Sequence, residues 1–249
     1  MGARYPSVVS ICLAGLLAIW ANGVARAQQA IGSTADARNQ VTREFGGSSG
    51  TLSVGDSVFL NEVVKTGADS LAKFVFVDST NLAVGPTSRV VLDRFVFEGD
   101  PSAQKVAVNL AKGVFRFTTG GLDKKAYTIN TPTAAIGVRG TVLDIAVRSN
   151  ADTRVTLVEG RALVCPRRAG VTLEQQARAC AAHGGHCDCV EILTAGQTAQ
   201  VRKVGGANQA SMASTPVNFA SLCAGDSSLC SSDSYAYAGL GGGGALCGR

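Results

Sequence analysis

The stretch KVAVNLAKGVFRF, residues 105–117, alternates apolar and polar side chains over two short runs. Successive side chains of a β-strand point to opposite faces, so Val106, Val108 and Leu110 share one face of the first run. In the second run the two phenylalanines point one way and Arg116 points the other. Each run therefore predicts a strand with one buried face and one face in water.

Similar short runs occur on both sides of this stretch, and Gly, Asp, Asn and Pro separate them. Strands of this length at this spacing predict an all-β module. The predicted strand 72–77 ends in Phe-Val-Phe-Val and is expected to be covered on both faces. The other predicted strands are residues 57–60, 81–84, 89–92, 126–131, 142–147, 154–158, 162–164, 190–193 and 197–201.

A central motif, TPTAAIGVRGT at residues 131–141, precedes the predicted strand 142–147. This motif resembles the FecR domain. Several flanking segments look like the same family pattern, and the resemblance covers about residues 51 to 202. These flanking segments are residues 52–56, 65–72, 76–82, 108–115, 158–164 and 195–197.

The resemblance implies a periplasmic all-β domain, similar to a short β-solenoid of stacked strands, with a binding or signalling role and no catalysis. In transmembrane members of the family, the domain is the periplasmic part of an anti-sigma regulator that receives a signal from an outer-membrane transporter. We expect neither a cytoplasmic helical domain nor an internal membrane span here. The chain therefore resembles the stand-alone exported FecR-domain proteins.

The first 27 residues read as a secretory signal peptide. Arg4 precedes an apolar run at residues 8–20, and Ala25-Arg26-Ala27 offers a cleavage site before Gln28. The alternative is an uncleaved membrane anchor, but the apolar run is shorter than the about 20 residues that span a membrane. Cleavage takes the formal net charge from +5 to +3 by removing two arginines. We expect an exported protein, periplasmic or extracellular.

Composition divides the rest of the chain. Residues 28–50 show no sustained period and predict a flexible lead-in, whereas residues 51–204 carry the FecR-like β domain. Residues 165–189 form a small cysteine-rich insertion, in which 173–182 is the one stretch with helical propensity. Residues 205–249 are rich in Gly, Ser and Ala and predict a mobile low-complexity tail.

The central motif itself suggests a structural corner. Its glycines suit a tight backbone turn, and the bidentate guanidinium of Arg139 suits a carboxylate on a partner. The alternative, which we favour from sequence, is that Arg139 satisfies backbone carbonyls or an internal acid such as Asp144. The residues expected to shape the corner are Pro132, Gly137, Gly140, Thr141 and Gly160.

Cysteines offer a second set of candidates. Of the eight, seven lie beyond the signal peptide, and an oxidising compartment favours disulfides. The four cysteines of the insertion allow three pairings, of which we favour Cys165 with Cys189 and Cys180 with Cys187. In the tail, Cys223 and Cys230 are candidates for a further disulfide, which leaves Cys247 either as a free thiol or for a disulfide-linked dimer. The alternative is a metal site formed by His183, His186, Cys187 and Cys189.

Several functions find no support in the sequence. Both histidines lie in the insertion and no G-x-S-x-G element occurs, so we expect no enzyme and no cofactor. The small net charge argues against nucleic-acid binding. We expect an exported FecR-domain protein that binds an envelope protein or glycan or senses a signal. The alternatives are a disulfide-linked structural or adhesive protein and, as a weaker one, a metal-binding protein.

Overall fold

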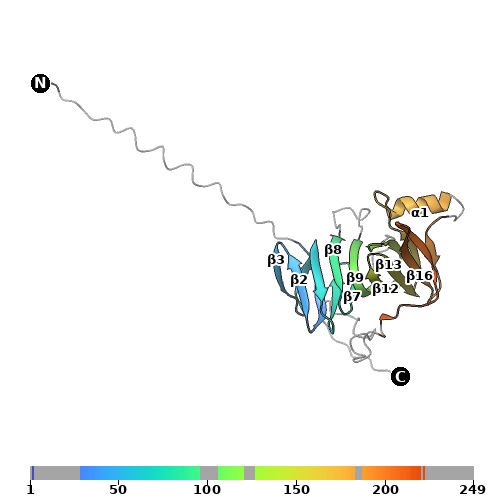
Figure 1. Cartoon of the computed structure of the whole chain (residues 1–249). Helices are drawn as coiled ribbons and strands as arrows, with labels where there is room; N and C mark the ends of the chain where they lie inside the picture. Colours follow the sequence, from blue (N-terminus) through green and yellow to red (C-terminus); the bar gives the residue numbers. More distant parts are fainter. Residues whose placement is uncertain are drawn as a thin grey trace, which may run out of the picture.

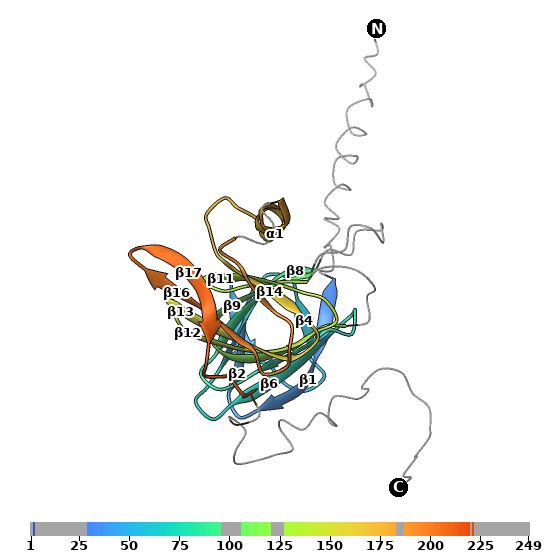
Figure 2. The same ribbon diagram turned by 90° about the vertical axis from the view of Figure 1, so that its right-hand side faces the viewer.

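The computed structural model describes residue 2 and residues 29–95, 106–120, 127–182, 187–219 and 221. Within these ranges the chain forms seventeen strands, β1–β17, and one helix, α1. The strands stack in two layers, which Figure 1 shows from the side and Figure 2 shows along the stack. The predicted all-β fold is confirmed.

Both layers are built from strands of both halves of the chain. The first layer contains, in spatial order, β4 (Ser57–Phe59), β1 (Ala30–Arg38), β6 (Leu71–Phe76), β7 (Asn81–Val84), the second half of β9 (Val106–Thr118), β12 (Val142–Ser149), β13 (Asp152–Glu159), β16 (Thr198–Val204) and β17 (Ala207–Ala213). The second layer contains β3 (Ser48–Thr51), β2 (Val41–Phe45), β5 (Glu62–Thr66), β8 (Arg89–Phe95), the first half of β9, β10 (Tyr127–Asn130), β11 (Ala134–Val138), β14 (Ala162–Pro166) and β15 (Val190–Ile192).

Neighbouring strands in the described part of the chain run antiparallel, except for the parallel pair β9 and β10. After β9 the chain changes layer after every two strands, so β10–β11 and β14–β15 lie in one layer and β12–β13 and β16–β17 in the other. The strands are stacked, as expected. They are stacked as antiparallel pairs, whereas a parallel β-helix stacks parallel strands from successive coils.

Strand β9 joins the two layers. Residues 106–112 pair with β8 and β10 in the second layer, and residues 113–118 pair with β7 and β12 in the first. The change of layer falls at Gly113, whose φ is 117°. A Cβ atom there would lie 1.9 Å from Oγ of Ser88. Only glycine fits this crossing, because both its backbone angle and its surroundings exclude a side chain.

The crossing also changes which positions face the core. Val108 and Leu110 are buried before it, and Phe115 and Phe117 are buried after it, so the inward positions switch from even to odd numbers. A register irregularity in the pairing of β8 with β9 accompanies the switch. The two alternating runs predicted from residues 105–117 are thus one strand with a bulge at its centre.

The predicted flexible lead-in at residues 28–50 is wrong, because these residues contain β1, β2 and most of β3. Strand β1 lies between β4 and β6 and pairs with both. A Cβ atom at Gly32 would lie 2.6 Å from the carbonyl oxygen of Val75, so small residues are needed for this close approach. The predicted signal peptide lies outside the described residues, apart from residue 2.

Between β14 and β15 the chain leaves the layers and forms α1 (Leu173–Ala182), where the helical propensity predicted it. Thr172 caps the helix: its hydroxyl accepts from the N–H of Gln175, and the Gln175 side chain accepts from the N–H of Thr172. Two disulfides hold the ends of the insertion, as described below. No helix in the described residues has the length and apolar character needed to cross a membrane.

The predicted mobile tail at 205–249 is wrong for its first part. Gly205 and Gly206, with φ of 58° and 86°, form a tight turn that leads into β17. The small polar residues of β17 show no strong pattern, but their backbone completes the first layer beside β16. Residues 220 and 222–249, including the three tail cysteines, lie outside the described residues.

After β17, residues 214–219 cross the outer face of the first layer as a strap. Phe219 is completely buried there, and its N–H donates to the buried carboxylate of Asp144 at 2.9 Å. The Arg116 guanidinium lies 5.7 Å from the centre of the Phe219 ring. Closer to β17, the N–H of Val217 donates to the hydroxyl of Thr156 at 2.7 Å. The strap therefore covers an outward face that alternation alone predicts to be in water.

Replacing Phe219 by Ala should lower the free energy of unfolding by about 3 kcal/mol, because a buried ring is lost. Met212→Ala is the matched control on β17, where the Met side chain is 52% exposed, and it should change stability by less than about 0.5 kcal/mol. Urea denaturation measures both. Equal stability of the two variants would contradict the described position of the strap.

Lys73 lies on β6 in the first layer, and its side chain is buried. Loss of hydration lowers the pKa of its ammonium group to about 8, and the nearby carboxylate of Asp36 raises that pKa only in part. The unfolded chain holds the proton up to about pH 10.4. The cost of burying the charge is therefore fully present below pH 8 and decreases as the pH rises above it.

Lys73→Met should raise the melting temperature at pH 7 by a few degrees, because Met packs in the same space without a charge. The difference between wild type and variant should shrink between pH 8 and pH 9.5, where the wild-type lysine loses its proton in the folded state. Thermal denaturation at several pH values measures this difference. A difference in melting temperature that stays constant over that pH range would refute the lowered pKa of Lys73.

Candidate functional site

Residues 131–141 form β11 and the turns at both of its ends. Strand β11 pairs with β14, and Val138 lies opposite Ala162. Because the two strands are antiparallel, the turn that follows β11 lies beside the turn that precedes β14. Two segments of the FecR-like pattern, separated by twenty residues in the chain, meet at one corner of the second layer.

Thr141 and Gly160 determine the shape of this corner. The Thr141 hydroxyl lies 2.9 Å from the carbonyl oxygen of Arg139 and 2.7 Å from that of Arg161, and it accepts from the N–H of Arg139. Gly160 has a φ of 86°, and a Cβ atom there would lie 2.0 Å from the carbonyl oxygen of Gly140. The motif therefore fixes the backbone of both arginines through small residues.

At the opposite end of β11, buried hydroxyl groups tie the two layers together. Thr133 donates to Thr153 at 2.8 Å, and Thr153 donates to Thr131 at 2.9 Å. The Thr131 hydroxyl also accepts from the N–H of Ala134. Thr153 belongs to β13 of the first layer, so these hydrogen bonds fix the position of the motif relative to that layer. Pro132 lies between two of these threonines and is half-buried.

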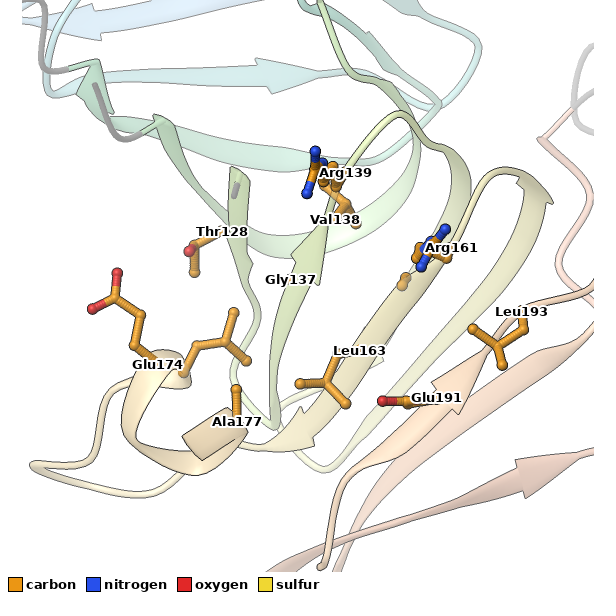
Figure 3. A pocket seen from close by; sticks show the side chains of 12 residues that line it. Thr128, Gly137, Val138, Arg139, Arg161, Leu163, Glu174, Ala177, Glu191 and Leu193 are labelled. Atoms are coloured by element: carbon orange, nitrogen blue, oxygen red, sulfur yellow. The ribbon is translucent and has the colours of Figure 1, made fainter. Parts of the chain in front are cut away.

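A groove of about 300 Å³ lies between α1 and the second layer, directly over β11 and β14 (Figure 3). Gly137 allows α1 to approach, because a Cβ atom there would lie 2.8 Å from Cδ2 of Leu173. Aliphatic side chains and four charged groups line the groove. Its lining residues are Thr128, Gly137, Val138, Arg139, Arg161, Ala162, Leu163, Leu173, Glu174, Ala177, Glu191 and Leu193.

Charges of opposite sign sit at different parts of this groove. Arg139 and Arg161 lie at the corner, Glu174 is on α1, and Glu191 is on β15 (Figure 3). All four side chains are exposed. Leu193 is 59% exposed and adds apolar surface near Glu191. The groove thus offers aliphatic surface beside two guanidinium groups on fixed backbone.

The predicted contact of Arg139 with Asp144 is wrong. Asp144 lies on β12 in the first layer, where Arg116 binds it with two hydrogen bonds of 2.7 and 2.9 Å. Arg116 is its register partner on β9. No described residue forms an ion pair with Arg139 or accepts a hydrogen bond from its side chain. Sequence alone could not choose between two arginines, because the choice depends on which layer each one occupies.

The insertion contains two disulfides, Cys165–Cys189 and Cys180–Cys187, which is the pairing that we favoured. The first closes the base of the insertion between β14 and β15, and the second ties the end of α1 to the following loop. His183 and His186, proposed as alternative metal ligands, lie outside the described residues. Cys187 and Cys189 are both in disulfides, so neither offers the thiolate that binds a metal.

The described residues of the groove lack the commonest catalytic pairs. Cysteine, histidine and serine are absent from them, so they include no such nucleophile paired with a histidine base. Perturbed ionisable groups in the described residues lie elsewhere. Burial raises the pKa of Tyr127 to about 12, and its hydroxyl donates to Asp78 inside the stack. Burial also raises the pKa of Glu62, which pairs with Arg43 on the second layer.

Sequence reasoning selected Arg139 but did not select Arg161 or the groove. The signal for Arg161 was present, since it adjoins Gly160 in the family-like pattern just as Arg139 adjoins Gly140. The groove had no sequence signal, because its walls come from the insertion and from four strands of the second layer, β10, β11, β14 and β15.

Gly160→Ala tests the corner, and Gly196→Ala is a matched control. Both glycines have a φ near 85°, but a Cβ atom at Gly196 meets nothing within 4 Å. We expect Gly196→Ala to cost about 1–2 kcal/mol from backbone strain alone. Gly160→Ala should cost at least about 2 kcal/mol more, because the methyl group overlaps the Gly140 carbonyl. Chemical denaturation measures both; equal costs would contradict the described corner.

Of the comparisons with known proteins, the match to a family model agrees with the motif. A search of the curated proteins found no match to the chain. Two crystal structures of a "putative anti-sigma factor" from Parabacteroides distasonis ATCC 8503, at 1.65 and 2.50 Å resolution, are similar in part, with TM-scores of 0.43 and 0.42 and sequence identities of 12% and 10%. Each alignment covers 60% of this chain and 59% of the other chain's length. Residues 62–163 match the family model of the FecR protein. The chain is therefore a FecR domain-containing protein.

Proposed function

We propose that this protein is an exported, non-enzymatic binding and signal-sensing module whose groove recognises an envelope protein. The recognised segment presents a carboxylate next to aliphatic side chains. The observation that carries this proposal is the placement of Arg139 and Arg161 beside the aliphatic surface of the groove. Guanidinium groups bind carboxylates through paired, charge-assisted hydrogen bonds.

The chemistry of the groove favours a peptide over a glycan. Its apolar surface comes from leucine, valine and alanine side chains, and no aromatic residue occurs among its described lining residues. An apolar peptide segment buries such surface with a gain in free energy. The glutamates on α1 and β15 disfavour a ligand with several acidic groups, so the proposal specifies one carboxylate at the arginine end.

Export and signal sensing rest on other observations. The N-terminal sequence has the composition of a secretory signal peptide, and two disulfides suit an oxidising compartment. The FecR match supports a signal-sensing role, in line with the resemblance stated above. The alternative, a disulfide-linked adhesive protein, depends on Cys223, Cys230 and Cys247, which lie outside the described residues, and no described contact favours it.

Two matched peptide libraries test the groove. In one, each aliphatic peptide carries a single carboxylate, and in the other that group is an amide. The wild-type protein should bind members of the first library about tenfold more tightly than their amide counterparts. Arg139→Gln should remove this preference, because one charge-assisted hydrogen-bond pair contributes about 1.5–3 kcal/mol.

Arg148→Gln is the control, since Arg148 is exposed on β12 and lies outside the groove. This variant should bind like the wild type, and neither variant should shift the melting temperature by more than about one degree. Fluorescence polarisation measures binding, and thermal denaturation measures stability. Unchanged affinity in Arg139→Gln, or a large loss of its stability, would assign this arginine a structural role instead.

A further inference from the structure

A second cavity, of about 270 Å³, lies on the other side of α1 from the groove and next to the two disulfides. The sulfur atoms of Cys180, Cys187 and Cys189 lie within 4.8 Å of one another. The two disulfides of the insertion are therefore neighbours in space, and this cavity opens onto them. The function proposed above does not use this cavity.

The cysteines differ strongly in their access to solvent. Cys165 is completely buried, and Cys180 is 8% exposed. Cys187 is exposed, and Cys189 is half-buried. An attacking thiolate must reach one sulfur of a disulfide, so access decides which bond breaks. In this insertion Cys187 is the sulfur that an external thiolate reaches first.

Two polar side chains of the cavity suit a ligand with a carboxylate. Gln176 is buried, and its Nε2 has no hydrogen-bond acceptor among the described residues. A buried donor without an acceptor is costly, and a ligand oxygen would satisfy it. Arg168 lines the same cavity, and its half-exposed guanidinium pairs with Asp188. The side chains beside the exposed sulfur thus include an unused donor and a cation that is paired with one carboxylate, that of Asp188.

We propose that this cavity is a thiol–disulfide exchange site for a small thiol that carries a carboxylate. The thiolate of the small molecule attacks Sγ of Cys187, and a new S–S bond forms as the Cys180–Cys187 bond breaks. The electron pair of the broken bond stays on Sγ of Cys180, which then takes a proton from water. One disulfide replaces another, so the step needs no additional oxidant or reductant.

The geometry also explains why the exchange stops at this mixed disulfide. The Cys180 thiolate lies close enough to Cys189 to attack the second disulfide. That attack would release Cys165 as a thiolate in a completely buried position. Burial raises the pKa of a thiol and makes it a poorer leaving group, and this effect is larger for Cys165 than for Cys180, which is 8% exposed and lines the cavity. The Cys165–Cys189 bond therefore stays intact while Cys187 carries the adduct.

Glutathione is the probe, and 2-mercaptoethanol is the comparison thiol because it has no carboxylate. After brief incubation of the purified full chain, free thiols are blocked and the adducts are located by peptide mass mapping, which separates the insertion cysteines from the tail cysteines. Glutathione should occupy Cys187 at least about tenfold more than Cys165 or Cys189. A first adduct on either of those two residues would overturn the proposal.

Variants separate recognition of the carboxylate from simple exposure of the sulfur. Arg168→Gln and Gln176→Leu should each slow the reaction with glutathione about fivefold, and the reaction with 2-mercaptoethanol less than twofold. Arg178→Gln, an exposed change on the same helix and outside the cavity, should alter neither rate. An unchanged melting temperature shows that a variant is folded. If Arg168→Gln and Gln176→Leu slow the reactions with glutathione and with 2-mercaptoethanol equally, the carboxylate site is refuted.

Discussion

The crossing of β9 between the layers at Gly113 is the constraint on which the rest of the structure depends. One half of this strand pairs with β8 and β10, and the other half pairs with β7 and β12. Its register therefore sets the register of both layers at once. Because a shift by one residue would turn every core side chain outward, the crossing also determines which residues form the core. The strands before and after β9 then extend the two layers in opposite directions along the stack (Figure 1).

In the FecR motif, the residues that hold the corner together are different from those that present charge to solvent. Its glycines and threonines form the corner through backbone contacts, and the arginine side chains at the same corner take no part in those contacts. The outer face of the first layer shows the opposite arrangement. There Arg116, Asp144 and Phe219 form a buried cluster in which each polar group has a partner. Charged residues thus have a structural role on the outer face of the first layer and in the Arg43–Glu62 pair of the second, whereas no described residue pairs with the Arg139 side chain.

Helix α1 serves two cavities with two of its faces. Leu173, Glu174 and Ala177 face the groove, whereas Gln176 and Cys180 line the cavity beside the disulfides. Residues three or four positions apart lie on one face of a helix, so this division follows from helical geometry. The helix has one large apolar residue, Leu173, and its position depends on the disulfides and on its approach to Gly137. A short insertion therefore adds two cavities to the β stack.

The all-β class, most central strands and the helix at 173–182 follow from the sequence alone, because alternation and helix propensity are local properties. The favoured disulfide pairing followed from the strands that flank the insertion. Strands β1, β3 and β17 were missed because their small residues carry no alternation, and β2 because it is short and has three polar residues between its two apolar ends. Backbone pairing with neighbouring strands orders all four. Only the tertiary structure decided three further features. These are the burial of Phe219, the choice of Arg116 as the partner of Asp144, and the existence of the groove. Each depends on contacts between distant segments, and the crossing of β9 and the stacking of the layers determine which segments meet.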